Sequence, residues 1–191
     1  MQPASQPVRG DGADRVAAEY GGPLRDIIHA FKYERRRSLT RPLARLMAEA
    51  ARDVLHDAAC VVPVPLHPWK RLTRGFNQAA DLAAELGPPL VHALWRPRWA
   101  RAQVGLPAAQ RRRNVQGAFA ASPWLSEWQR AALIAGRVVV LVDDVRTTGA
   151  TLSECAQVLT SMGAGEVRRL TLAQAPARDA ARPAGRDRPF L

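Results

Sequence analysis

The stretch RVVVLVDDVRTTGAT, residues 137–151, decides the fold of this chain. Val138 to Val142 form an uninterrupted and mostly β-branched run, which predicts a central parallel strand covered on both faces. Asp143 and Asp144 follow at its carboxyl end, where two carboxylates can accept hydrogen bonds from vicinal ribose hydroxyls. The turn from Thr147 to Thr151 offers backbone N–H groups, hydroxyls and the positive end of a helix dipole to a phosphate. This order of groups indicates a site for a sugar phosphate.

Length and composition predict one folded domain with loose ends. The chain has 191 residues, of which 47% are apolar, enough for a sizeable core. Residues 1–16 and 176–191 are rich in Gly, Pro and polar groups, so we expect disordered tails around a domain at 17–175. The best apolar run, Ala131 to Val142, is too short to span a membrane, and the amino-terminal residues lack the apolar core of a signal peptide. A cytoplasmic protein is therefore expected.

The net charge of +11 is carried by 26 arginines and only two lysines, Lys32 and Lys70. Codon bias alone can produce this skew, so the total charge is weak evidence for nucleic-acid binding. The distribution is more informative, because six arginines and no acid lie between Arg96 and Arg113. Such a field attracts a polyanion, either a pyrophosphate or a nucleic-acid backbone. Cys60 and Cys155 fit no zinc-site spacing and are expected to be small buried hydrophobes.

Hydrophobic periodicity predicts helices alternating with strands, and hence a parallel α/β sheet. The expected helices lie at 24–33, 40–54, 78–86 and 151–162, with Thr40 capping the second. The expected strands lie at 59–64, 89–95, 138–142 and 167–173, with a candidate returning strand at 115–120.

The segment from Asp143 to Thr151 resembles the phosphoribosyl-pyrophosphate (PRPP) loop of type I phosphoribosyltransferases; the alternative is a buried strand whose turn happens to be acidic and polar. Four further segments extend the resemblance to the ComF family, a branch of these proteins. They are Phe31-Lys32-Tyr33, VPVPLH at 62–67, RGFNQ at 74–78, and Gln103 with Leu106, Arg111, Asn114-Val115 and Gly117-Ala118-Phe119. The resemblance implies a type I phosphoribosyltransferase fold: a parallel sheet of about five strands flanked by helices, with a flexible hood.

The resemblance also implies roles for individual residues. PRPP or ribose 5-phosphate would be bound by the loop residues Asp143, Asp144, Val145, Arg146, Thr147, Thr148, Gly149, Ala150 and Thr151. Leu66, His67, Arg71 and Arg74 would form the pyrophosphate loop, and Arg74 would join Asp143 and Asp144 as a catalytic residue. Mg²⁺ would bind through PRPP, with no metal site on the protein. His67 could instead be a turn residue bonded to backbone, and Arg71 a solvated surface charge.

Gln103, Arg111 and Asn114 would belong to the hood that closes over PRPP, or else to an ordinary surface loop made basic by the arginine bias. Two departures from related sequences limit the resemblance. The Cys-rich zinc module that usually begins ComF proteins is missing here. The 6-oxopurine salvage enzymes carry an acid where this chain has Thr147, which cannot act as a general base near neutral pH, so purine salvage is disfavoured.

Three functions remain open at this stage. The first is an enzyme that displaces pyrophosphate from ribose C1, with an acceptor that the sequence does not name. The second is a non-catalytic ComF component of single-stranded DNA uptake, acting with other competence proteins. Trp69, Phe76, Trp95 and Trp99 lie among basic residues and could stack bases, although each could equally be core packing, Trp95 above all. The third is a PRPP-sensing regulator.

Overall fold

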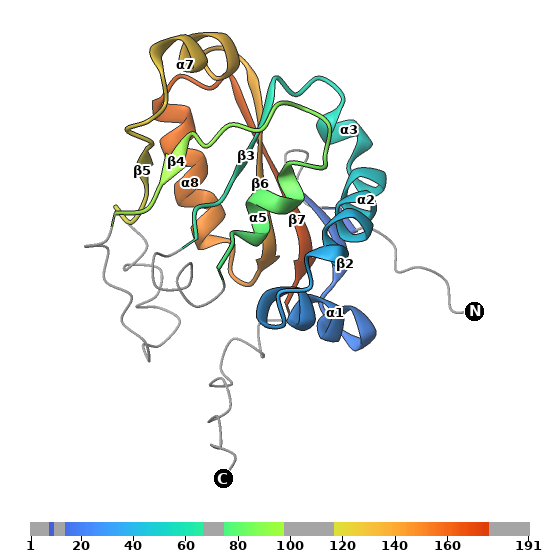
Figure 1. Cartoon of the computed structure of the whole chain (residues 1–191). Coiled ribbons are helices and arrows are strands. Elements are labelled where there is room, and N and C mark those ends of the chain that lie inside the picture. Colours follow the sequence, from blue (N-terminus) through green and yellow to red (C-terminus); the bar gives the residue numbers. More distant parts are fainter. Residues whose placement is uncertain (1–7, 10–13, 67–74, 98–116, 176–191) are drawn as a thin grey trace.

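The computed structural model describes residues 8–9, 14–66, 75–97 and 117–175. A five-stranded sheet runs through the middle of the molecule, with helices on both faces (Figure 1). Its order is β1 (Val8–Arg9), β2 (Asp14–Glu19), β7 (Glu166–Gln174), β6 (Val138–Arg146) and β3 (Cys60–Pro63). The last four strands are parallel, and β1 pairs antiparallel with β2 at the edge. The parallel α/β fold expected from the sequence is confirmed.

The helices fall into two groups, one on each face of the sheet. One group consists of α1 (Gly22–Tyr33), α2 (Thr40–Ala50), α3 (Arg52–Leu55) and α5 (Gln78–Ala83), with a 3₁₀ turn, η1 (Arg37–Leu39), between the first two. The other face is covered by α8 (Ala150–Ser161) and by a small antiparallel sheet of β4 (Leu94–Trp95) and β5 (Ala120–Ala121). The short helix α7 (Glu127–Leu133) precedes β6.

Strand β6 lies between β7 and β3 and contributes to both halves of the core. Val140 and Val142 belong to the cluster beneath α1, α2 and α5. Val139 and Leu141 belong to the cluster beneath α8, because successive side chains of a strand point to opposite faces. All four are fully buried, as expected for a parallel strand covered on both sides. The acids that follow therefore lie at the carboxyl edge of the sheet, between helices on both faces.

The amino-terminal boundary of the domain lies earlier than the sequence predicts. Residues 1–16 were expected to be a disordered tail, but Val8–Arg9 and Asp14–Glu19 are strands of the main sheet. Val16, Ala17 and Ala18 are buried, because β2 pairs along most of its length with β7. The carboxyl-terminal tail expected at 176–191 lies outside the described residues.

Two predicted strands are short in the structure and pair with each other outside the main sheet. In the segment 89–95, Leu90 forms an isolated bridge with Val61, and Leu94–Trp95 pairs instead with Ala120–Ala121. Prolines at 88 and 89 have no N–H to give to a ladder, which limits pairing with β3. Thr40 is the first residue of α2 and makes no side-chain cap, so its predicted capping role is wrong.

Candidate functional site

The segment after β6 has the strand–turn–helix form expected of it. Strand β6 continues through both acids to Arg146, and α8 begins at Ala150. Gly149 is the N-cap of α8 and has a φ of 75°, in the left-handed region that favours glycine. An added Cβ there would meet only the Cδ of Arg146, at 3.6 Å, so the backbone angle requires glycine more than the space does. Thr147 and Thr148 are exposed, and the amino end of α8 directs its N–H groups toward this turn.

The two acids have different surroundings. The Asp144 carboxylate forms an ion pair with Lys32 of α1, with 2.9 Å between Oδ2 and Nζ. Asp143 Oδ1 accepts a hydrogen bond of 2.8 Å from the backbone N–H of Asp144. Burial and, to a smaller extent, the negative charge of Asp143 raise the pKa of the Cys155 thiol on α8. The acids thus continue the alternation of β6, with Asp144 on the α1 face and Asp143 on the α8 face.

Arg146 anchors the turn to two neighbouring strands. Its guanidinium donates to Asp14 of β2 at 3.0 Å and to Gln174 of β7 at 2.7 Å. Arg169 of β7 pairs with the same aspartate. The Arg146 side chain is therefore held by Asp14 and Gln174, and the part expected of it in PRPP binding stays a prediction.

A polar cavity of about 270 Å³ opens beside the turn. It is lined by loop and first-turn residues and by the ends of β2 and β7: Asp14, Arg146, Thr147, Thr148, Gly149, Leu152, Ser153, Arg169 and Gln174. Two arginines and one acid line it, which leaves a local excess of positive charge. A phosphate is the ligand that this combination of cations, hydroxyls and helix N-terminus can hold.

A second cavity, of about 990 Å³, opens at the carboxyl end of β3. It lies close to the acids, because Val64 N–H donates to Val142 O at 2.9 Å, one residue before Asp143. Its walls include Leu66, Phe76 and the pair Trp95–Trp124, whose rings meet edge to face with centroids 5.6 Å apart. Trp124 is 77% exposed. Its contact with Trp95 depends on the β4–β5 pairing, and sequence reasoning did not single it out.

Comparisons with known proteins give matches over more than half of the chain. Residues 72–188 match the family described as "Phosphoribosyl transferase domain". The chain is 34% identical over 170 residues to "Competence protein F" of Haemophilus influenzae, covering 84% of this chain and 72% of that one. It is 35% identical over 167 residues to "DNA utilization protein YhgH" of Escherichia coli, covering 80% and 67%. The chain belongs to the ComF family. Among solved structures, glutamine PRPP amidotransferase from B. subtilis is 23% identical to this ComF chain, with a TM-score of 0.43. The match covers 70% of this chain and 26% of the B. subtilis protein chain.

In this ComF protein, Arg96 is not part of an exposed basic field. Its guanidinium lies over the Phe119 ring, 5.1 Å from the centroid, and burial lowers its pKa. Glu154 of α8 lies nearby and accepts a 2.7 Å hydrogen bond from the Ala118 N–H. Burial raises the pKa of Glu154, although N–H groups of residues 117–119 and the charge of Arg96 oppose that shift.

The remaining site predictions for this ComF chain fall partly outside the described residues. Leu66 and Phe76 line the larger cavity, and Trp95 is half-buried in its wall rather than in the core. Both cysteines are free and buried, as expected. The following residues that were discussed from the sequence lie outside the described ranges: His67, Trp69, Lys70, Arg71, Arg74, Trp99, Gln103, Arg111 and Asn114. Within the described ranges, none of the helices is long and apolar enough to cross a membrane.

Proposed function

We propose that this ComF protein binds PRPP or ribose 5-phosphate at residues 143–151, and that a nucleophilic acceptor forms a bond to ribose C1 of bound PRPP as pyrophosphate leaves. The observation that carries the proposal is the junction of β6 and α8. It puts Asp143 and Asp144 shortly before a turn, from Thr147 to Gly149, that lines the polar cavity. The acids would accept hydrogen bonds from the ribose hydroxyls, and the turn would hold the 5′-phosphate.

The leaving pyrophosphate would lie toward β3. That strand is the parallel neighbour of β6, and its carboxyl end opens into the larger cavity. Bond breaking at C1 develops positive charge on the ribose ring, which the carboxylates of β6 would stabilise. The contributions of Leu66, His67, Arg71 and Arg74 to the pyrophosphate site, and that of the hood residues Gln103, Arg111 and Asn114, are part of this proposal.

The carboxylates of the loop suit Mg²⁺ only as minor partners. Mg²⁺ prefers oxygen ligands, but Asp144 already pairs with the ammonium group of Lys32. Among the described residues, no three His, Cys, Asp or Glu side chains lie close enough together to hold a metal ion. Mg²⁺ would therefore bind mainly through the oxygens of PRPP, as in many nucleotide sites, and its charge would neutralise the leaving pyrophosphate.

Replacing both acids tests the proposal directly. Asp143→Asn/Asp144→Asn keeps the shape of the side chains but removes the charge that strengthens their hydrogen bonds to the ribose. Calorimetry with PRPP and Mg²⁺, and with ribose 5-phosphate, should show roughly a hundred-fold loss of affinity, the value expected for two charge-assisted hydrogen bonds. Asp26→Asn, on an exposed position of α1, is the matched control and should bind like the wild type. Equal affinities in all three proteins would reject the assignment.

A second candidate function, binding of single-stranded DNA, is supported by the Trp95–Trp124 pair. An exposed indole beside a cavity is a surface on which a base can stack, and the names of the two ComF relatives concern competence and DNA utilization. The same cavity would receive the leaving pyrophosphate, so DNA and PRPP would compete for this part of the site.

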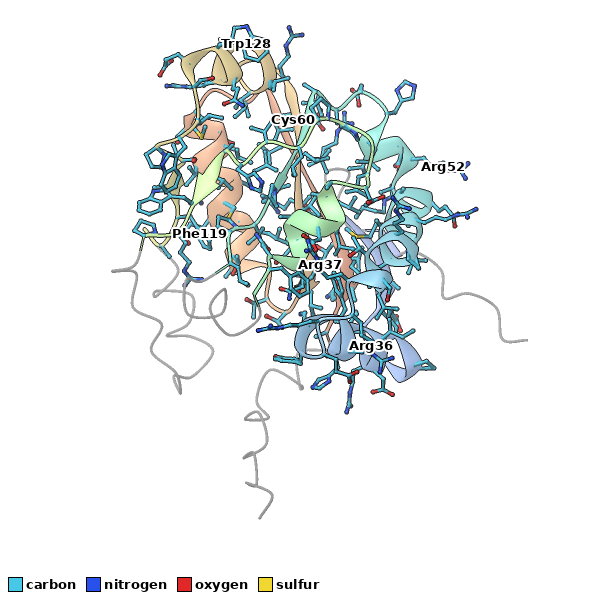
Figure 2. The ribbon with its side chains drawn as sticks, viewed as in Figure 1. Arg36, Arg37, Arg52, Cys60, Phe119 and Trp128 are labelled. Atoms are coloured by element: carbon cyan, nitrogen blue, oxygen red, sulfur yellow. The ribbon has the colours of Figure 1, made fainter. Side chains whose placement is uncertain are left out.

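Two exposed tryptophans allow a matched test of this role. Trp124→Ala should weaken binding of a short oligothymidylate by roughly ten-fold, the loss expected for one stacked base. Trp128→Ala removes an indole of similar exposure, 73% against 77%, from α7. Trp128 lies near the amino end of β6, far from the carboxyl edge of the sheet, and its loss should leave binding unchanged (Figure 2). Fluorescence anisotropy measures the affinity of both variants for the oligothymidylate. Equal losses of affinity in the two variants would point to non-specific effects.

A further inference from the structure

The motif Phe31-Lys32-Tyr33 at the end of α1 has no role in the function proposed above, and its three side chains have three different surroundings. Phe31 is fully buried and meets Phe76 edge to face, with centroids 5.6 Å apart. Tyr33 is exposed and its ring lies 4.7 Å from that of His29. Lys32 lies between them in the sequence and reaches Asp144. Phe31 therefore fixes the end of the helix, and Lys32 extends from that fixed point.

The ion pair is mostly shielded from water. The side chains of Lys32 and Asp144 are 14% and 13% exposed. Helix α1 lies beside the carboxyl ends of β6 and β7, on the face of the sheet to which Asp144 points (Figure 1). Solvent screens such a pair much less than a surface pair, and removal of the ammonium would leave a largely buried carboxylate without its counter-charge.

The choice of lysine matters in a chain with 26 arginines. A guanidinium in this chain can take both oxygens of an aspartate: Arg37 binds Oδ2 and Oδ1 of Asp81 at 2.8 and 3.1 Å. Arg168 likewise reaches both oxygens of Asp57. The compact ammonium of Lys32 is a point charge that lies 2.9 Å from Oδ2 of Asp144. A carboxylate has about four acceptor sites, so Asp144 can accept further hydrogen bonds beside this ion pair.

We propose that Lys32 is a positioning residue of the sugar site, which holds Asp144 by one oxygen so that the other accepts a hydrogen bond from a ribose hydroxyl. This rests on the proposed function, in which Asp144 binds the ribose. Lys32 lies 112 positions before Asp144 in the sequence. Through this contact, helix α1 would help to recognise the sugar rather than the phosphate.

The test compares two ligands that share a phosphate but differ in the sugar. Calorimetry is carried out with ribose 5-phosphate and with inorganic phosphate on the full chain. Lys32→Met removes the charge and keeps the length of the side chain, and it should lower the affinity for ribose 5-phosphate by roughly ten-fold, the value of one charge-assisted hydrogen bond. The affinity for inorganic phosphate should not change. A merely structural role for Lys32 would lower both affinities together.

Three further variants complete the design. Arg25→Met removes a positive charge from an exposed position of the same helix and should leave both affinities unchanged. Lys32→Arg keeps the charge but should also lose the preference for the sugar, because a guanidinium would occupy both oxygens of Asp144. Lys32→Met added to Asp144→Asn should cost no further affinity, since the two residues act through one contact. If the Met variant does not fold, as judged by circular dichroism, Lys32→Gln takes its place.

The outcomes separate the two proposals. A wild-type protein that binds neither PRPP nor ribose 5-phosphate overturns the proposed function, and the sugar-site role of Lys32 with it. A wild-type protein that binds ribose 5-phosphate, with a Lys32→Met variant that keeps the wild-type ratio of the two affinities, overturns the role of Lys32 alone. Lys32→Arg binding like the wild type would also overturn it, because one free oxygen would then not be needed.

Discussion

Glu154 lies one turn into α8 and is only 9% exposed as a residue. Oε1 accepts the N–H of Ala118, whereas Oε2 has no hydrogen-bond partner among the described residues. A half-satisfied buried carboxylate is unfavourable when ionised, so burial raises its pKa above the ordinary 4.5. The residue ties the helix that begins at the candidate phosphate site to residues 117–119.

The raised pKa has a consequence for stability that depends on pH. The folded state favours the protonated carboxyl more than the unfolded state does, so this contribution is fully present below about pH 4.5 and is lost as pH rises through the folded pKa. Glu154→Gln keeps an oxygen acceptor and does not titrate. As the pH is raised from 4 to 7, the free energy of unfolding of Glu154→Gln should therefore increase relative to that of the wild type. Urea unfolding at both pH values measures this change. Glu127→Gln, whose side chain is 92% exposed, should show no such change. The prediction would be contradicted if the unfolding free energies of Glu154→Gln and the wild type differed by the same amount at both pH values.

At the scale of residues, the sequence predicts what is local and misses what is brought together by folding. The acids, the two threonines and Gly149 lie within seven consecutive positions, so their order alone indicates their arrangement. Lys32 was recognised as part of a motif, but its contact with Asp144 depends on how α1 crosses the edge of the sheet. The Trp95–Trp124 contact likewise depends on the pairing of β4 with β5.

At the scale of elements, the clearest success is β6 and the clearest failure is β2. Four of the five residues in the predicted core of β6 are β-branched, and no alternative structure suits so apolar a run. The segment of β2, DRVAAE, contains two alanines, which have little preference for strands, and it follows a stretch rich in Gly and Pro. The segment forms a strand because it pairs with β7, and that pairing cannot be predicted from the residues of β2 alone.

Helix α7 was missed although its signal was present. Ser126 and Gln129 form a capping box, in which each side chain bonds to the backbone N–H of the other. The spacing Ser-x-x-Gln is a readable helix start, but no apolar face follows it, and none of the residues of α7 is buried. The strands expected at 89–95 and 115–120 were located approximately, since Leu94–Trp95 and Ala120–Ala121 are short strands that pair with each other.

At the scale of the whole molecule, β2 connects the amino-terminal segment to the candidate site. Asp14 pairs with Arg146 of the loop strand and with Arg169 of β7, and its side chain is 20% exposed. The edge of the sheet therefore helps to fix the turn that would hold the phosphate. A region predicted from the sequence to be a disordered tail thus contributes Asp14 to the support of the site.

Deletion of residues 1–19 tests this arrangement. The deletion removes β1 and β2, exposes one edge of β7, and takes away the buried Val16, Ala17 and Ala18 together with the carboxylate that orders Arg146. Burial of one valine alone contributes about 1.5–3 kcal/mol. With the alanines and the ladder hydrogen bonds, the free energy of unfolding in urea should fall by about 3 kcal/mol or more, a large fraction of the total for a typical domain.

Deletion of residues 1–7 is the matched control, because it removes none of the described strands and should leave the unfolding curve close to that of the full chain. The two deletions differ by residues 8–19, which hold β1 and β2, so the difference between their unfolding free energies measures what these strands contribute, including the pairing of β2 with β7. If both proteins unfold at the same urea concentration as the full chain, β2 adds nothing to stability, and the domain begins near residue 17 as the sequence alone suggested. A loss confined to the longer deletion would instead establish that the parallel sheet, and the support of the loop at Arg146, extends to Asp14.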